Sequence, residues 1–203
     1  MSHTDIKYAQ SVSRWEPNAR GRLEQAAMEL YIERGLEQTT VAEIAKRAGL
    51  TERTFFRYFV DKREVLFWGA GRLQELFVAT IIESPESDAP IDAVANALEV
   101  AAALLQERRD YSRQRQAVIN ANTGLREREL IKLATLAVAI TDALRQRGVK
   151  DPAASLTAEA GIAVFKIGFE RWITATVQQD FPQLIRDSLD ELRVVLGGTQ
   201  SSA

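Results

Sequence analysis

The chain has 203 residues, of which 46% are hydrophobic and 27% charged, and its net charge is −2. That length suits a domain of about 50 residues joined to a larger one, with enough apolar residues for a packed core. There is no Cys, the single His is His3, no apolar run approaches the roughly 20 residues that span a bilayer, and no signal pattern is visible. These absences argue against disulfides and against His- or thiolate-based catalysis, and a cytoplasmic protein is expected.

The first segment, residues 1–15, is polar and aperiodic and is predicted to be a flexible arm. A helix is predicted next, because Pro17 suits its first position and Gly35 suits its end. Between them, apolar residues recur at helical spacing: Leu23, Ala26, Ala27 and Leu30. We expect this helix to brace the two that follow.

Two short helices and a tight turn are predicted after Gly35. Thr40 and Glu43 have the spacing of a capping box, and Thr51 can cap the second helix. Gly49 supplies the turn, and small Ala45 allows the two helices to approach closely. The second helix would turn three aromatic residues inward: Phe55, Tyr58 and Phe59. This pattern predicts a helix-turn-helix, whose second helix lies in a DNA major groove; an ordinary helical hairpin is the alternative.

The charge of this motif favours DNA. Between Lys46 and Arg63 there are six basic residues and two acidic ones. Lys62 and Arg63 follow the cap residue Asp61, where cations oppose the helix dipole unless a phosphate lies nearby. Arg53 or Thr54 is predicted to contact base edges, and Thr40, Tyr58 and Lys62 to contact phosphates. The remaining predicted DNA-binding residues are Thr51, Phe56 and Arg57.

The motif resembles the signature of the tetracycline-repressor (TetR) family over residues 17–66. The residues that carry the resemblance are Gly35, Leu36, Thr39, Thr40, Ile44, Ala45, Ala48, Gly49, Thr54, Tyr58, Phe59, Lys62 and Leu66. The resemblance implies an all-α homodimer with a three-helix DNA-binding head (residues 16–62), a larger ligand-binding and dimerisation body (63–196) and a tail (197–203). The family often has Tyr at the position of Phe56, where this chain lacks a hydroxyl for phosphate and presents an aromatic edge.

The body is predicted to begin with a long helix from Asp61 to about Glu83, which would link it to the head. Trp68 lies near that joint, as a core residue or a ligand contact. After the break at Ser84–Pro90, three more helices are predicted: Ile91–Arg108, Tyr111–Ile119 and one from Asn122 or Thr123 to Arg147, with Gly148 as its cap.

An arginine-rich stretch runs from Arg108 to Arg128, with acidic residues among and beside the arginines. We favour a solvated surface of salt bridges; the alternative is a rim that binds a phosphate- or carboxylate-bearing ligand. The order of features here resembles the body of TetR relatives that sense acyl-CoA-like molecules. The polar candidates for ligand contact are Arg113, Asn120, Asn122, Glu170 and Arg171.

The last two helices are predicted to form the dimer surface as a four-helix bundle. One runs from Asp151 and Pro152 to about Gln179 and repeats small residues every seven positions; the other begins at Asp180 and Pro182 and carries an apolar stripe. The predicted interface residues are Gly161, Gly168, Ala175, Ile185, Leu189 and Leu192. Packing of both helices within one subunit is the alternative.

An aromatic stripe on the first of these helices is predicted to be either core or the lining of a ligand pocket: Phe165, Phe169 and Trp172. The sequence therefore predicts a homodimeric, ligand-responsive transcription regulator. We expect a repressor released from a palindromic operator by a small apolar effector, for example a fatty-acyl molecule, without cofactor or metal. Two alternatives remain: a helical enzyme with buried carboxylates, disfavoured because no paired Asp/Glu motif stands out, and a ligand-free architectural DNA-binding protein.

Overall fold

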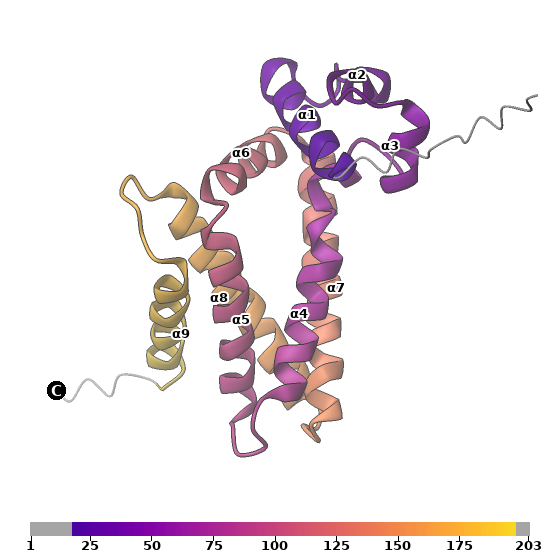
Figure 1. The fold of residues 1–203 in the computed structure, drawn as a ribbon. Helices are drawn as coiled ribbons and strands as arrows, with labels where there is room; N and C mark the ends of the chain where they lie inside the picture. The colour runs from indigo at the N-terminus through magenta and orange to yellow at the C-terminus, as the bar shows by residue number, and fades with distance from the viewer. Residues whose placement is uncertain (1–17, 198–203) are drawn as a thin grey trace, which may run out of the picture.

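The structure is a computed structural model that describes residues 18–197, and within that range it contains helices and no strand (Figure 1). The all-α prediction is confirmed. The helical segments are α1 (Ala19–Arg34), α2 (Val41–Arg47), α3 (Glu52–Tyr58), the 3-10 turn η1 (Glu64–Phe67), α4 (Gly69–Glu83), α5 (Pro90–Gln106), α6 (Arg109–Asn120), α7 (Thr123–Gln146), α8 (Ala153–Thr174) and α9 (Phe181–Gly197). The predicted arm, Pro17 and most of the predicted tail lie outside the described residues.

The helices form a small head, α1 to α3, mounted on a longer helical body (Figure 1). In the body, α4 and α7 run side by side, α5 packs against α4, and α8 packs against α7. Helix α9 lies on the outer side and packs against α5 and α8. The short helix α6 lies at the head end of the body and contacts α1.

The core of the head includes five residues from beyond the predicted boundary at residue 62: Val65, Leu66 and Phe67 of η1, Ile119 and Leu125. Buried apolar side chains from α1, α2 and α3 surround Phe55, which is fully buried. Ile119 of α6 and Leu125 of α7 are also fully buried in this cluster. The corner between α6 and α7 is therefore part of the head's packing, so a boundary at residues 62 and 63 does not separate two independent cores.

The predicted long helix from Asp61 is instead two pieces. The Asp61 carboxylate accepts a hydrogen bond from the Glu64 amide at 2.8 Å, which caps the 3-10 turn η1, and the α-helix α4 begins only at Gly69. By length and composition, the segment Glu64–Glu83 has enough apolar character to cross a membrane, contrary to our expectation. Phe77 and Ile81 of this segment are nevertheless fully buried in the core of the body.

The seam of small residues on α8 packs within the subunit, and the predicted dimer surface is wrong at these positions. A Cβ on Gly161 would lie 2.5 Å from Val94 Cγ1 on α5, and one on Gly168 would lie 2.9 Å from Ile185 Cδ1 on α9. Small residues are needed here because helices of the same chain cross closely. Ile185 and Leu189 are likewise buried within the subunit. Leu192, which packs against the core, and Ala175, just beyond the end of α8, are only half-buried.

Candidate nucleic-acid interface

The local signals that predict the helix-turn-helix are present in the structure. Glu43 N donates to Thr40 Oγ1 at 3.3 Å and Thr40 N donates to Glu43 Oε2 at 2.9 Å, which completes the capping box of α2. Thr51 caps α3 by accepting from the Thr54 amide at 3.2 Å. Both caps satisfy amides that a helix leaves unpaired at its start, so the two helices begin at fixed residues.

Gly49 fixes the turn between α2 and α3 for two reasons. Its φ is +66°, in the left-handed region that favours glycine. A Cβ at this position would also lie 2.7 Å from Arg22 Nη2, whose guanidinium donates to the Ala48 carbonyl. The turn is therefore held from α1 as well as by its own backbone conformation.

Helix α3 separates an apolar inner face from an exposed outer face. Phe55 and Phe59 are buried, whereas Arg53, Phe56 and Arg57 are exposed. Burial of the two inner rings fixes the rotation of α3, so the same three outer residues always face away from the head. This is the arrangement that a helix needs to enter a DNA groove.

The predicted DNA-binding residues differ in what their polar atoms already bind. Within the part of the chain that the structure describes, Arg53 makes no hydrogen bond or ion pair. The Arg57 guanidinium donates to Tyr58 Oη at 3.0 Å and lies over its ring. Thr54 and Thr51 share a hydrogen bond between their hydroxyls at 3.0 Å. Arg53 therefore has the greatest freedom to contact a base.

Two of the predicted phosphate contacts are engaged elsewhere. Lys62 Nζ donates to the carbonyls of Leu36 and Thr39 at 2.9 Å each, and to that of Glu37 at 3.3 Å. These bonds use all three ammonium hydrogens. The Thr40 hydroxyl donates to Glu43 Oε2 at 2.8 Å. Neither side chain has a free donor for phosphate, and Lys62 instead holds the loop between α1 and α2 in place.

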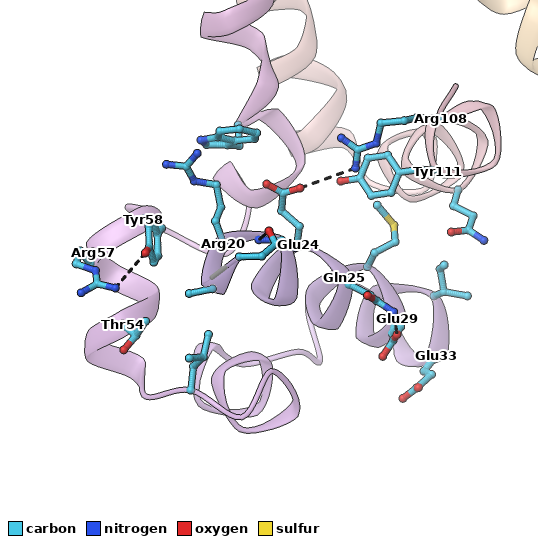
Figure 2. A pocket seen from close by; sticks show the side chains of 18 residues that line it. Arg20, Glu24, Gln25, Glu29, Glu33, Thr54, Arg57, Tyr58, Arg108 and Tyr111 are labelled. Atoms are coloured by element: carbon cyan, nitrogen blue, oxygen red, sulfur yellow. Dashed lines mark hydrogen bonds and ion pairs between the residues drawn. The ribbon is translucent and has the colours of Figure 1, made fainter. Parts of the chain in front are cut away.

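A cavity of about 1170 Å³ lies where α1 and α3 of the head meet α6 of the body (Figure 2). Arg20 stacks over the Trp68 ring, with its guanidinium carbon 4.2 Å from the ring centroid. One face of Trp68, which we predicted as a core residue or a ligand contact, is therefore covered by the chain itself. Glu24 of α1 is buried, and burial raises its pKa although Arg108 lies 3.9 Å away and Arg20 is close. This cavity has both polar and apolar lining residues and belongs to the joint between head and body.

Three of the six arginines in the arginine-rich stretch form salt bridges within the chain: Arg108, Arg115 and Arg128. Arg115 donates to the Leu66 carbonyl at 2.7 Å and to Glu129 at 3.1 Å. Arg128 pairs with Asp61 at 3.2 Å and with Glu64 at 3.0 Å. Hydrogen bonds from the Glu64 amide and Arg128 lower the pKa of the Asp61 carboxyl, although burial opposes them. These contacts tie α6 and α7 to η1 and to its cap residue Asp61.

The residues predicted to bind ligand do not come together in one open pocket. Arg113 and Asn120 lie on the exposed side of α6, where Asn120 accepts from Gln116 at 3.1 Å. The aromatic stripe is instead packed core: the rings of Trp172 and Phe181 stack at 4.6 Å, and those of Phe165 and Phe169 at 5.9 Å. Sequence reasoning missed Phe181, although its apolar side chain at the first position of the last helix was a usable signal.

One atom in this aromatic cluster is left without a partner. Trp172 is fully buried, and its Nε1 has no hydrogen-bond partner among the described residues. A buried unpaired donor costs about 1–3 kcal/mol, so it is an unusual feature of a packed core. The cavity at the head–body joint and a smaller one between α5 and α9 are not lined by this cluster.

A capped, basic helix-turn-helix head on a helical body defines a DNA-binding transcription regulator. Comparison with known families agrees: residues 24–67 match bacterial regulatory proteins of the tetR family, and residues 88–197 match the MftR C-terminal domain. The second match alone covers more than half of the chain. The protein belongs to the TetR family of transcription regulators, with a body of the MftR C-terminal type.

Individual relatives support the same assignment at different levels. The HTH-type transcriptional regulator TcmR of Streptomyces glaucescens is 36% identical over 78 residues, which are 38% of this chain and 34% of TcmR. The alignment thus spans about a third of that relative, so it bears on a limited part of both proteins.

Solved structures share the fold across most of the chain. FadR of Thermus thermophilus, a TetR-family repressor in complex with lauroyl-CoA, is 22% identical over 91% of this chain and 96% of its own, with a TM-score of 0.53. FadR of Bacillus subtilis in complex with stearoyl-CoA is 20% identical over 85% and 96% of the two chains, with a TM-score of 0.61. A TetR-family regulator from Syntrophomonas wolfei is 16% identical over 91% and 98%, with a TM-score of 0.66. At these identities the likeness concerns the fold alone.

Proposed function

We propose that the protein is a homodimeric, cytoplasmic repressor whose two α3 helices read a palindromic operator and whose DNA affinity falls when a fatty-acyl or similarly elongated apolar effector binds the body. The observation that carries this function is the outer face of α3. Arg53 is exposed without a partner in the described part of the chain, while the buried rings of Phe55 and Phe59 fix the helix behind it.

The roles of the head residues follow from their free atoms. Arg53 can donate two hydrogen bonds to the edge of a guanine, the commonest specific contact in the major groove. Arg57 and Tyr58 form one hydrogen-bonded unit at the end of α3 that suits a phosphate. Thr51 and Thr54 lie at the start of α3, where their hydroxyls can contact the sugar-phosphate backbone of the DNA.

The dimer surface is proposed to be the exposed apolar face of α8 and α9 in place of the small-residue seam. Leu156 and Ile167 on α8 are 66% and 52% exposed, and they share a face with Ala163. Arg171, one turn after Ile167, lies 3.4 Å from Glu191 on α9, so the two helices present adjoining surfaces. The end of α9 adds three exposed apolar residues: Val194, Val195 and Leu196. Apolar groups at these positions are best stabilised by a second copy.

The effector is proposed to enter the aromatic cluster of Phe165, Phe169, Trp172 and Phe181. These rings pack against one another in the core of the body, and an acyl chain could replace their mutual contacts. An oxygen of the effector would satisfy the unpaired Trp172 Nε1. Two FadR proteins of the same fold were crystallised with lauroyl-CoA and stearoyl-CoA, which supports testing acyl thioesters first.

Release from DNA is proposed to follow from the spacing of the heads. Two reading helices must enter successive major grooves about 34–36 Å apart. Helix α6 contacts the aromatic end of α8 on one side and the head on the other. An effector lowers DNA affinity only if it binds the DNA-incompetent arrangement more tightly.

The experiment has two stages. Genomic fragments bound by the purified protein are selected and reduced to a minimal duplex, and its affinity is then measured with and without lauroyl-CoA at fixed ionic strength. We expect a palindromic site and a loss of affinity of roughly 5- to 150-fold. Selection of a site whose affinity is unchanged by every acyl thioester that binds the protein would support the architectural alternative. Recovery of no preferred site would contradict the function.

A further inference from the structure

Phe56 is an exposed apolar residue on the outer face of α3, next to the exposed arginines Arg53 and Arg57. Its side chain is 55% exposed, although a phenyl ring normally contributes most when it is buried. The ring contacts the fully buried Phe55 edge to face, with centroids 5.5 Å apart. Phe56 is therefore held in one place by the core of the head while most of its surface faces outward.

The surroundings of Phe56 restrict what can cover it. Arg53 lies three residues earlier, at helical spacing that places both side chains on one face, and Arg57 follows directly. Both arginines are exposed, and so are acidic Glu52 one turn before Phe56 and apolar Val60 one turn after it, so the charge around the ring is positive on balance. A partner must therefore be anionic around its edge and must offer an apolar group at its centre, within reach of the same helix face.

The DNA major groove has one apolar group that meets these conditions. Thymine presents a C5-methyl group there, flanked by anionic phosphates, and phenylalanine side chains can pack against it. A phenyl ring has no donor or acceptor for the polar edges of bases or for phosphate. Charge complementarity and the lack of polar atoms together favour this contact over a contact with the backbone.

We propose that Phe56 selects thymine by packing against its C5-methyl group, at a base pair adjacent to the one read by Arg53. The inference rests on the proposed operator binding and adds a second specificity element to it. Arg53 selects by hydrogen bonds, whereas Phe56 selects by an apolar contact. Each half-site therefore requires one thymine whose methyl group, rather than its Watson–Crick edge, contributes to recognition.

Replacing thymine by uracil tests this directly, because the change removes the methyl group and leaves the base pairing intact. Each thymine of the minimal operator is replaced in turn in both half-sites, and affinity for the unaltered protein is measured by fluorescence anisotropy at fixed ionic strength. Burial of one methyl group corresponds to about fourfold in affinity, so symmetric replacement at the correct position should weaken binding roughly 15-fold. Replacements at other positions should have little effect.

Variants of the protein connect the effect to Phe56. In Phe56→Ala, thymine and uracil operators should bind equally, because the ring that contacts the methyl group is absent. Ile32→Ala is a matched control: Ile32 is also 55% exposed but lies on α1, so its removal should preserve the preference for thymine. Circular dichroism checks that both variants are folded, and the uracil series on the unaltered protein does not depend on either.

The outcomes separate this inference from the function on which it rests. A preferred operator whose affinity changes less than twofold with every uracil replacement would overturn the role of Phe56 and leave operator recognition intact. Persistence of the uracil effect in Phe56→Ala would assign the methyl contact to another residue and would also overturn it. If no preferred operator is recovered, the proposed function itself fails, and the inference fails with it.

Discussion

Arg109, the first residue of α6, donates hydrogen bonds to the main-chain oxygens of Trp172 at 2.9 Å and Ala175 at 2.6 Å. These carbonyls lie at the end of α8, where a helix leaves acceptors unpaired and favours a cation. The same helix α6 contacts the head through Arg115, which donates to the Leu66 carbonyl. Arg109 and Arg115 thus connect the aromatic cluster of the body to the head through one short helix.

Arg109→Ala should weaken communication between effector and DNA. Without these bonds, movement of Trp172 no longer displaces α6, so the effect of lauroyl-CoA on operator affinity should shrink by at least about threefold from the expected coupling. Operator affinity without effector should stay close to that of the unaltered protein. Arg113→Ala is the control, because Arg113 is exposed on the same helix and makes no hydrogen bond or ion pair with the described residues. An Arg109→Ala protein with full coupling would contradict this route.

Trp172→Phe should weaken effector binding with little loss of stability. The indole ring is fully buried, so Trp172→Ala would leave a cavity and cost about 3–5 kcal/mol of stability. A change in effector affinity could then result from partial unfolding. Phe keeps one aromatic ring that can stack on Phe181, and it lacks the second ring of the indole together with the unpaired Nε1. Isothermal titration with lauroyl-CoA measures the affinity, and thermal unfolding checks the fold. Unchanged effector affinity would show that Nε1 does not contact the ligand.

Gly168→Leu and Ile167→Glu, at neighbouring positions of α8, should affect different properties: the first the stability of the subunit, the second its association into dimers. Gly168 faces Ile185 inside the subunit, so the larger side chain should lower the free energy of unfolding by about 1–3 kcal/mol without a specific change in association. Ile167 is exposed on the proposed dimer face, so a charge there should give folded monomers. Analytical ultracentrifugation and denaturant unfolding distinguish the two. Dimers that survive Ile167→Glu would place the interface elsewhere.

Stability should depend on pH through Glu24 in a direction that its burial dictates. Burial raises the pKa of Glu24 in the folded chain, so ionisation costs more there than in the unfolded chain. The free energy of unfolding therefore falls as pH rises from the ordinary value of about 4.3 through the raised value. Glu24→Gln lacks this loss, so its stability relative to the unaltered protein should increase with pH.

Glu33→Gln provides a control of opposite sign. Hydrogen bonds from Arg47 lower the pKa of the Glu33 carboxyl, so its contribution to stability is present above the ordinary pKa and is lost as pH falls through the lowered one. The stability of Glu33→Gln relative to the unaltered protein should therefore decrease as pH rises. Equal slopes for the two variants in thermal unfolding between about pH 3 and pH 7 would contradict the burial argument.

The sequence was sufficient where local chemistry decides the structure. Thr40, Glu43, Gly49 and Thr51 predicted the caps and the turn, because each acts on backbone groups within a few residues. It was insufficient where distant elements meet. The small residues Gly161 and Gly168 signal a close helix crossing, but a sequence does not show whether the crossing helix belongs to the same subunit.

The head–body joint escaped prediction for the same reason. Ile119 and Leu125 carry no sign that they pack in the head, and Lys62 has the charge expected of a phosphate contact although three backbone carbonyls bind it. Trp68 was correctly placed at the joint, but Arg20, which covers its ring, lies 48 positions earlier in the chain. Such pairs are decided by tertiary packing.

The most direct test of the account is selection of operator fragments by the unaltered protein and by Arg53→Ala, followed by affinity measurements over a range of salt concentrations. Loss of Arg53 should cost about 1–3 kcal/mol of binding and relax the preference at one base pair in each half-site, with the remaining positions unchanged. Lys62→Ala, which removes a loop contact, should keep the same sequence preference. Identical preferences and affinities for Arg53→Ala and the unaltered protein would contradict the claim that the outer face of α3 reads DNA.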